Sequence, residues 1–195
     1  MLTHYRESLH GIADPVARWL LRARVQPSQL TVLGLVVSLV AAHGFAQGRL
    51  RTAALLLALA GLCDFFDGAL ARVSGSVSPF GAFLDSVVDR YSDLVVLMGV
   101  VIFYERGDDF TGVFFTMLTV VGTIMTSYTK ARAQSIGLNC EVGLVERPER
   151  LIVLIGAAVF NLLTPAIVAL ALLTNVTALQ RIFHVRKVAG RSRRP

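Results

Sequence analysis

Charged residues are scarce in this chain, and their scarcity argues against an ordinary soluble domain. They make up 16% of the 195 residues, whereas a soluble domain has about 25%. Cysteine is scarce as well, because Cys63 and Cys140 have neither metal-site spacing nor the number that a disulfide framework needs. The net charge is +6, but the basic residues form no stripe along a soluble face, which argues against nucleic acid as a partner.

Hydrophobic residues make up 54% of the sequence, and they gather in long blocks. A helix needs about 20 apolar residues to cross a bilayer. We therefore expect an all-α, polytopic membrane protein with six transmembrane helices. The expected spans are residues 30–46, 52–64, 83–104, 110–129, 151–163 and 165–183.

The first 26 residues have the pattern of an amphipathic helix that lies in the membrane interface. Apolar side chains recur there at helical spacing, at Leu9, Ile12, Ala13, Val16, Trp19 and Leu20. An ordinary solvated helix is the alternative. The expected organisation is an N-terminal interfacial helix over residues 1–26, a six-helix transmembrane catalytic domain over residues 27–186 and a basic C-terminal tail over residues 187–195.

The distribution of arginine predicts how these helices are oriented. Arginines gather in residues 1–26, in the loop before residue 150 and in the tail, whereas the intervening loops are acidic or uncharged. By the positive-inside rule both chain ends face the cytoplasm, although Arg49 and Arg51 lie in an outward loop. We expect a multi-pass protein of the cell membrane, with its active site facing the cytoplasm.

Two pairs of aspartates lie within residues 63–93, where acidic side chains near a membrane need a partner or a function. Asp64 and Asp67 are three residues apart and Asp85 and Asp89 are four apart, so each pair shares one face of a helix. The short connection makes the two helices antiparallel neighbours, and the four carboxylates then converge. Divalent cations relieve the repulsion among them, and two such ions are a recurrent arrangement for phosphoryl displacement.

The pattern DxxDGxxAR, followed after eight residues by GxxxDxxxD, resembles the signature of the CDP-alcohol phosphotransferase family. The fixed positions are Asp64, Asp67, Gly68, Ala71, Arg72, Gly81, Asp85 and Asp89. Members of that family move a substituted phosphate from a CDP-alcohol to an acceptor hydroxyl and release CMP. The resemblance implies that the four aspartates ligate Mg²⁺ or Mn²⁺, two ions in all, and that Asp89 is also the catalytic base.

The same resemblance implies a binding site for the CDP donor. Its residues are Ser28, Gln29, Leu30, Thr31, Gly68, Ala71, Arg72, Ser78 and Gly81. Ser28 stands where the family usually has asparagine or aspartate. Asp93 continues the face of Asp85 and Asp89 by one turn, and we expect it to be structural, because the family pattern ends at Asp89.

A basic cluster with the pattern KARA…ERPER resembles the subset of this family that uses inositol phosphate as acceptor. The resemblance implies that the acceptor phosphate is held by Lys130, Arg132, Arg147, Arg150 and Arg181. A phosphorylated acceptor needs such a cationic cradle, which a neutral polyol does not. The alternative is a topology signal with no role in binding.

These features together predict a membrane enzyme that moves a phosphatidyl or ether-lipid phosphatidyl group from a CDP-lipid to inositol phosphate. The family resemblance also implies a homodimer. The same chemistry with glycerol 3-phosphate as acceptor, or with a CDP-inositol donor, stays open. The alternative of another class is an ion-coupled transporter that uses the carboxylates as a cation site, and such a transporter has no need of the intervening GxxAR.

Overall fold

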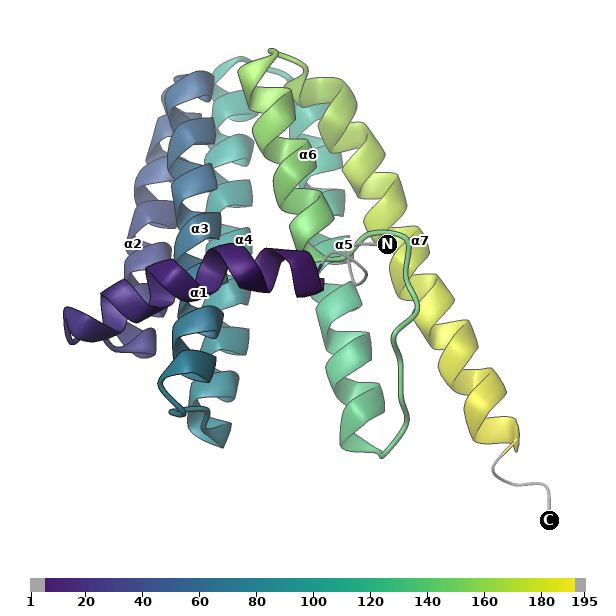
Figure 1. Ribbon diagram of the computed structural model, residues 1–195. Helices are drawn as coiled ribbons and strands as arrows, with labels where there is room; N and C mark the ends of the chain where they lie inside the picture. The colour runs from purple at the N-terminus through teal and green to yellow at the C-terminus, as the bar shows by residue number, and fades with distance from the viewer. Residues whose placement is uncertain (1–5, 192–195) are drawn as a thin grey trace.

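The computed structural model describes residues 6–191, and the side chains of residues 13–190. Over this part the chain forms seven α-helices: α1 (Arg6–Arg22), α2 (Pro27–Ala46), α3 (Leu50–Val73), α4 (Pro79–Arg106), α5 (Phe110–Ser135), α6 (Arg147–Val159) and α7 (Leu163–Arg191). The helices α2 to α7 run up and down through the molecule, and α1 crosses in front of the bundle (Figure 1). The expectation of an all-helical chain is confirmed.

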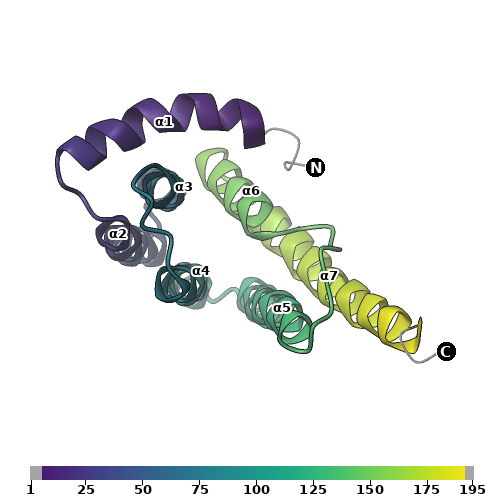
Figure 2. The ribbon, with the colours of Figure 1, turned by 60° about the horizontal axis from the view of Figure 1, so that its bottom comes forward.

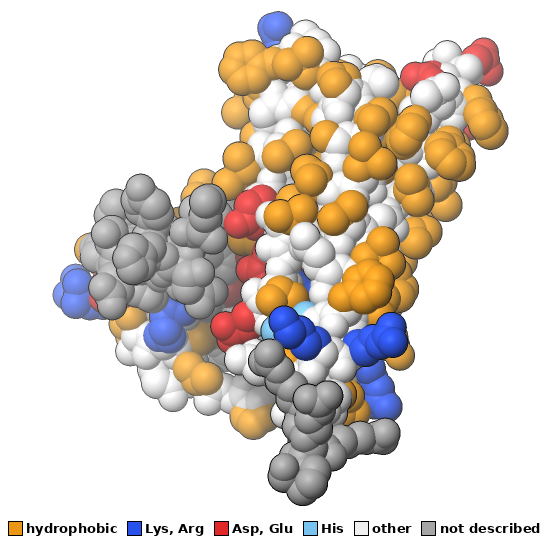
Figure 3. Space-filling model, turned by 90° about the vertical axis from the view of Figure 1, so that its right-hand side faces the viewer, with side chains coloured by type: hydrophobic (Ala, Val, Ile, Leu, Met, Phe, Trp, Pro, Cys, Tyr) orange, Lys and Arg blue, Asp and Glu red, His pale blue; other side chains and the backbone are white. Residues whose placement is uncertain are grey.

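Four helices, α2, α3, α5 and α7, are long and apolar enough to cross a membrane. The other two expected spans fall on α4, which carries several charged side chains, and on α6, which has 13 residues. Large hydrophobic side chains are exposed along the outer faces of the long helices. Figure 3 shows them over the upper part of one face, with basic side chains gathered toward its lower end. This is the surface of a membrane protein.

The expected fifth span, residues 151–163, is shifted by four residues from α6, whereas the expected sixth span, residues 165–183, lies within α7. Helix α6 starts at Arg147 because Glu146 and Glu149 form a capping box around its first turn. It ends at Val159, and Asn161 adopts a left-handed φ of 57° in the loop before α7. Helix α7 continues to Arg191, into the expected tail. Residues 1–5 and 192–195, which belong to the expected N-terminal helix and tail, lie outside the described residues.

The bundle consists of two groups of helices. Helix α2 packs against both α3 and α4, while α5 packs against α7, and α4 and α6 connect the groups (Figure 2). Small residues allow the helices to approach closely, as is common in membrane bundles. A Cβ at Gly99 of α4 would collide with the backbone of Ala42 in α2, and one at Gly122 of α5 would collide with Thr174 of α7.

Helix α1 lies across the lower half of α3. Its Ala13 and Ala17 are fully buried, and they pack with Ala69 of α3. Val16 and Trp19, two of the residues on the expected apolar face, are exposed, and the side chains of Leu9 and Ile12 lie outside the described part. The packed face of α1 therefore follows its alanines, which leaves Val16 and Trp19 on the surface.

Candidate active site

Three carboxylates gather where the lower half of α3 faces the first turns of α4. One oxygen each of Asp64, Asp67 and Asp85 lies within 4.8 Å of the others. Asp67 is buried, and its Oδ2 accepts a hydrogen bond of 2.6 Å from the Thr31 hydroxyl of α2. The expected convergence of the two aspartate pairs is therefore present for three of the four residues.

The donor set of this cluster fits a divalent cation. Within the described part of the chain, the buried Oδ1 of Asp85 has no hydrogen-bond partner. A buried carboxylate oxygen is costly without a partner, and neighbouring carboxylates add repulsion. A set of ligands that are all oxygen suits Mg²⁺ or Mn²⁺. The cluster therefore has the chemistry of a metal site.

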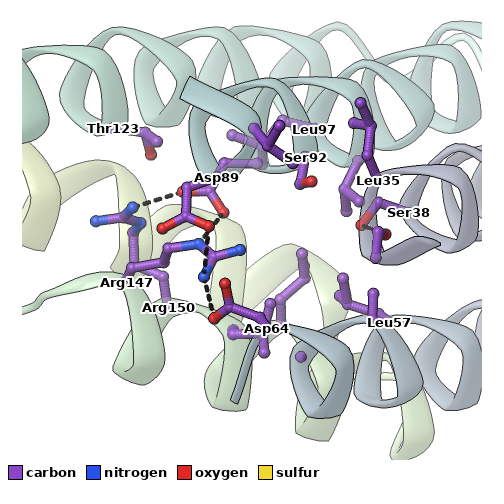
Figure 4. A pocket seen from close by; sticks show the side chains of 18 of the residues that line it. Leu35, Ser38, Leu57, Asp64, Asp89, Ser92, Leu97, Thr123, Arg147 and Arg150 are labelled. Atoms are coloured by element: carbon purple, nitrogen blue, oxygen red, sulfur yellow. Dashed lines mark hydrogen bonds and ion pairs between the residues drawn. The ribbon is translucent and has the colours of Figure 1, made fainter. Parts of the chain in front are cut away.

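The fourth aspartate, Asp89, lies beside the cluster and faces a cation. Its Oδ1 is 3.1 Å from Nη1 of Arg147, and the same Nη1 donates to Oδ2 of Asp64 at 2.5 Å (Figure 4). Nε of the same guanidinium lies 3.5 Å from Oδ1 of Asp93, so three carboxylates surround the charge of Arg147. Arg147 therefore links the three-carboxylate cluster to Asp89.

A cleft adjoins the three-carboxylate cluster, and most of the expected donor-binding residues line it. The residues that line it include Ser28, Thr31, Asp67, Gly68, Ala71, Arg72, Ser78, Gly81 and Asp85. The first residues of α2 and of α4 both border the cleft, and helix N-termini favour anions. Two of the expected donor-binding residues are not among those that line the cleft. Leu30 is buried in the bundle, and the side chain of Gln29 accepts a hydrogen bond of 2.9 Å from the Gln26 N–H.

A second cavity extends from the cluster into the bundle (Figure 4). Its charged lining comes from α3, α4 and α6, namely Asp64, Asp67, Asp89, Asp93, Arg147 and Arg150. Deeper in the bundle it is bordered by the hydroxyls of Ser38, Ser92 and Thr123. The two cavities share Asp67, Asp64 lines the second, and Asp85 the first. The cluster therefore stands between two spaces, one toward the start of α2 and one toward α6.

The five cations expected at the acceptor phosphate take different positions. Arg147 and Arg150 line the inner cavity. Lys130 and Arg181 both contact Oε1 of Glu146, at 3.3 Å and 3.1 Å. Arg132 is exposed and donates to the Ser135 hydroxyl at 3.2 Å. The structure thus brings four of the five to the region where α6 begins, and it places Arg132 outside that set.

Two acidic residues lie near these cations: Asp93, which was expected to be structural, and Glu146. Asp93 contacts both Arg147 and Arg150, and Glu146 contacts Lys130 and Arg181. The sequence signal for Asp93 is the four-residue spacing that continues from Asp85 and Asp89. For Glu146 the signal is its position beside Arg147 in the ERPER stretch, where glutamates alternate with arginines, although its partners come from α5 and α7.

Known proteins resemble this chain over most of its length. A family model described as CDP-alcohol phosphatidyltransferase matches residues 24–185. Archaetidylinositol phosphate synthase of Methanothermobacter thermautotrophicus is 37% identical over 191 residues, which cover 95% of this chain and 94% of that protein. Phosphatidylinositol phosphate synthase of Mycobacteroides abscessus is 37% identical over 194 residues, which cover 95% and 88%.

Solved structures are similar in fold as well as in sequence. Phosphatidylinositol phosphate synthase of Mycobacterium tuberculosis with CDP-DAG bound has a TM-score of 0.82 and 34% identity, covering 89% of this chain and 93% of that one. The same enzyme in complex with manganese and citrate has a TM-score of 0.82 and 36% identity, covering 89% and 88%.

Proposed function

Because this chain belongs to the CDP-alcohol phosphatidyltransferase family, we propose that it transfers a phosphatidyl group from a CDP-lipid to inositol phosphate and releases CMP. The observation that carries the proposal is the cluster of Asp64, Asp67 and Asp85. Asp67 and Asp85 of this cluster line a cleft together with four other residues of the same motif, Gly68, Ala71, Arg72 and Gly81. The names of relatives that are 37% identical support inositol phosphate as the acceptor.

The CDP part of the donor binds in the cleft beside α2 and α4. Arg72 lines it and can pair with phosphate oxygens. Gly68 and Ala71 leave room for the nucleotide, and the helix N-termini at Ser28 and Ser78 favour the diphosphate. Thr31 and Gly81 complete this wall, whereas Gln29 and Leu30 contribute through the fold of the first turn of α2. The CDP-DAG held by a similar structure supports this type of donor.

The four aspartates, Asp64, Asp67, Asp85 and Asp89, hold two Mg²⁺ or Mn²⁺ ions. The unpartnered Oδ1 of Asp85 and the manganese in a similar structure support this assignment. Bound ions supply positive charge against the diphosphate of the donor and the phosphate of the leaving CMP. Thr31 orients the Asp67 carboxylate through their hydrogen bond.

Asp89 is the general base of the transfer. It takes the proton from the acceptor hydroxyl, whose oxygen forms a bond to the lipid-linked β-phosphorus while the bond from that phosphorus to the oxygen of CMP breaks. Its position beside the three-carboxylate cluster, 3.1 Å from Nη1 of Arg147, supports this role. The Arg147 guanidinium faces both Asp64 and Asp89, so it can also contact anionic oxygens near the reacting phosphorus.

The phosphate of the acceptor binds at the start of α6. Arg150 and Arg147 line the inner cavity, and Lys130 approaches from α5. Arg181 supports this arrangement from α7, where its Nε and Nη1 donate to backbone carbonyls of Val142 and Thr126. Arg132 acts at a distance as part of the local positive charge.

We further propose the membrane arrangement that suits this chemistry. The six helices α2 to α7 cross the membrane, and α1 lies in the interface with Trp19 at headgroup depth. Both chain ends and the active site face the cytoplasm of a multi-pass cell-membrane protein, which functions as a homodimer. The apolar length of α2, α3, α5 and α7 and the crossing direction of α1 support this arrangement.

An acceptor screen tests the proposal. Purified protein receives Mn²⁺ or Mg²⁺, a CDP-diacylglycerol or CDP-linked ether lipid, and one acceptor, and CMP release is followed. We expect turnover with inositol phosphate and little with inositol or glycerol 3-phosphate, because only inositol phosphate matches the names of the relatives. Preference for glycerol 3-phosphate, or for CDP-inositol as donor, would overturn the acceptor assignment. Cation flux without CMP formation would identify a transporter instead.

A further inference from the structure

Asp93 lies on α4 one turn beyond Asp89, and both of its oxygens face cations. Its Oδ2 accepts a hydrogen bond of 2.6 Å from Nη2 of Arg150, and its Oδ1 lies 3.5 Å from Nε of Arg147. The side chain is 13% exposed and lines the inner cavity. Asp93 is therefore a nearly buried carboxylate that is shared by two arginines of α6.

Arg150 is held at one nitrogen, and its other nitrogens are available. Among the described residues, the Arg150 side chain makes one hydrogen bond, which is to Asp93. The residue is 8% exposed and lines the cavity. A guanidinium has five N–H donors in a planar fork, so a carboxylate on one edge leaves the other edge for an anion. Asp93 thus orients the Arg150 guanidinium from one edge, and the opposite edge can bind a phosphate.

Arg181 shows the contrasting arrangement. Its Nε, Nη1 and Nη2 donate to the carbonyl of Val142, the carbonyl of Thr126 and the carboxylate of Glu146. All three nitrogens are engaged, and the residue is 4% exposed. Arg181 therefore fixes the loop before α6, whereas Arg150 keeps donors for a ligand.

The charge on Arg150 also requires Asp93. A buried guanidinium without a counter-ion is strongly destabilised. Asp93 supplies the counter-ion for Arg150, while Arg147 has two further carboxylates, Asp64 and Asp89. Neutralising Asp93 would release Arg150 and would leave Arg147 bound only to the residues assigned to metal and base. The guanidinium groups of Arg147 and Arg150 would then no longer be held together by a shared carboxylate.

We propose that Asp93 is a positioning residue that fixes Arg150 and Arg147 for the phosphate of the acceptor. This inference rests on the proposed function. Asp93 acts through the arginines and has no part in metal ligation or proton transfer. Its removal should therefore weaken use of the phosphorylated acceptor and leave donor recognition, on the other side of the three-carboxylate cluster, unchanged.

Steady-state kinetics of Asp93→Asn test this inference. We expect the KM for inositol phosphate to rise by about tenfold or more, while the KM for the CDP-lipid stays within about twofold of wild type. The longer carboxylate of Asp93→Glu should recover part of the loss, because it keeps the charge. The control is Asp108→Asn, the same exchange in the loop after α4, at a residue with a left-handed φ of 51° that asparagine tolerates.

A double-mutant cycle determines whether Asp93 acts through Arg150. If it does, Asp93→Asn should add little to the KM defect of Arg150→Gln. Fully additive defects, an unchanged acceptor KM, or equal changes in the KM values of donor and acceptor would each overturn the inference. If Asp93→Asn does not fold, the same comparison is made with Asp93→Glu, for which a rise of about threefold in the acceptor KM is expected. Failure of wild-type protein to release CMP with inositol phosphate would instead contradict the proposed function.

Discussion

At the scale of single residues, one hydrogen bond joins the start of α2 to the carboxylate cluster. The Thr31 hydroxyl donates to Oδ2 of Asp67 at 2.6 Å, and the carbonyl of Pro27, at 3.1 Å, is the more distant acceptor for the same proton. Both Thr31 and Asp67 are buried, so water cannot readily replace the bond. An oriented carboxylate oxygen is what a metal site requires, and Thr31 supplies the orientation from a different helix.

Thr31→Val should therefore weaken metal binding while keeping the volume of the side chain. We expect the Mn²⁺ concentration at half-maximal activity to rise by about tenfold or more. The measurement is a Mn²⁺ titration of CMP release at saturating donor and acceptor. Thr31→Ser, which keeps the hydroxyl, is the matched control and should titrate close to wild type. An unchanged titration of Thr31→Val would show that the bond does not orient the ligand.

Asp89 is the residue whose removal should affect chemistry most and donor binding least. We expect Asp89→Asn to lower kcat by about 100-fold or more, because it removes the base that accepts the hydroxyl proton. CDP-lipid binding, measured separately on the same preparation, should be largely retained. Activity close to wild type in Asp89→Asn would rule out its assignment as the base.

At the scale of helices, the start of α6 decides which basic side chains line the inner cavity. Glu146 caps the helix, and Pro148 lies in its first turn. Arg147 and Arg150 therefore both belong to the first turn, three residues apart on neighbouring positions of one face. The same Glu146 contacts Lys130 of α5 and Arg181 of α7, so one residue ties the start of α6 to two other helices.

The crossing of α2 and α4 depends on a glycine, and its replacement should destabilise the bundle. A Cβ at Gly99 would meet the backbone of Ala42, which cannot move as a flexible side chain can. We expect Gly99→Ala to cost about 1–3 kcal/mol and to lower the melting temperature in detergent. Gly156→Ala in α6 is the matched control, because a Cβ there meets nothing within 4 Å. Equal melting temperatures for the two variants would contradict close packing at Gly99.

At the scale of the whole molecule, the loops are divided between two ends of the bundle. The connections after α3 and after α5 lie at the lower end in Figure 1, and those after α2, α4 and α6 lie at the upper end. The three-carboxylate cluster is built from the lower half of α3 and the first turns of α4. The proposed orientation therefore puts the cluster on the cytoplasmic side.

Labelling of single cysteines in intact cells tests that orientation. In a variant without Cys63 and Cys140, Gln47→Cys after α2 should react with a membrane-impermeant thiol reagent. Ser76→Cys after α3 and Asn139→Cys after α5 should react only after the membrane is opened. All three positions are exposed in the structure. The reverse pattern would invert the proposed topology, and labelling of all three in intact cells would contradict six spans.

The sequence was sufficient to predict features that depend on one helix at a time. Helical periodicity places Asp64 with Asp67 and Asp85 with Asp89 on shared faces. The expected direct packing of α3 against α4 is not found in the described part of the chain, because α2 packs against both of these helices instead. The structure confirms the all-helical fold and brings Asp64, Asp67 and Asp85 into one cluster. The length of the hydrophobic blocks also predicted the four long apolar helices α2, α3, α5 and α7. The ends of α6 and α7 depended on capping and loop geometry.

Only the tertiary structure decided which partner each charged residue has. Arg147 meets Asp64 across 83 positions of sequence, and Thr31 meets Asp67 across 36. Such pairings depend on how helices cross, and helix crossing is set by close contacts such as Gly99 on Ala42 that no local pattern encodes. The sequence by itself therefore determined the reaction class through its aspartate motif. Packing decided that Asp93 faces two arginines and that Arg181 is engaged by the loop.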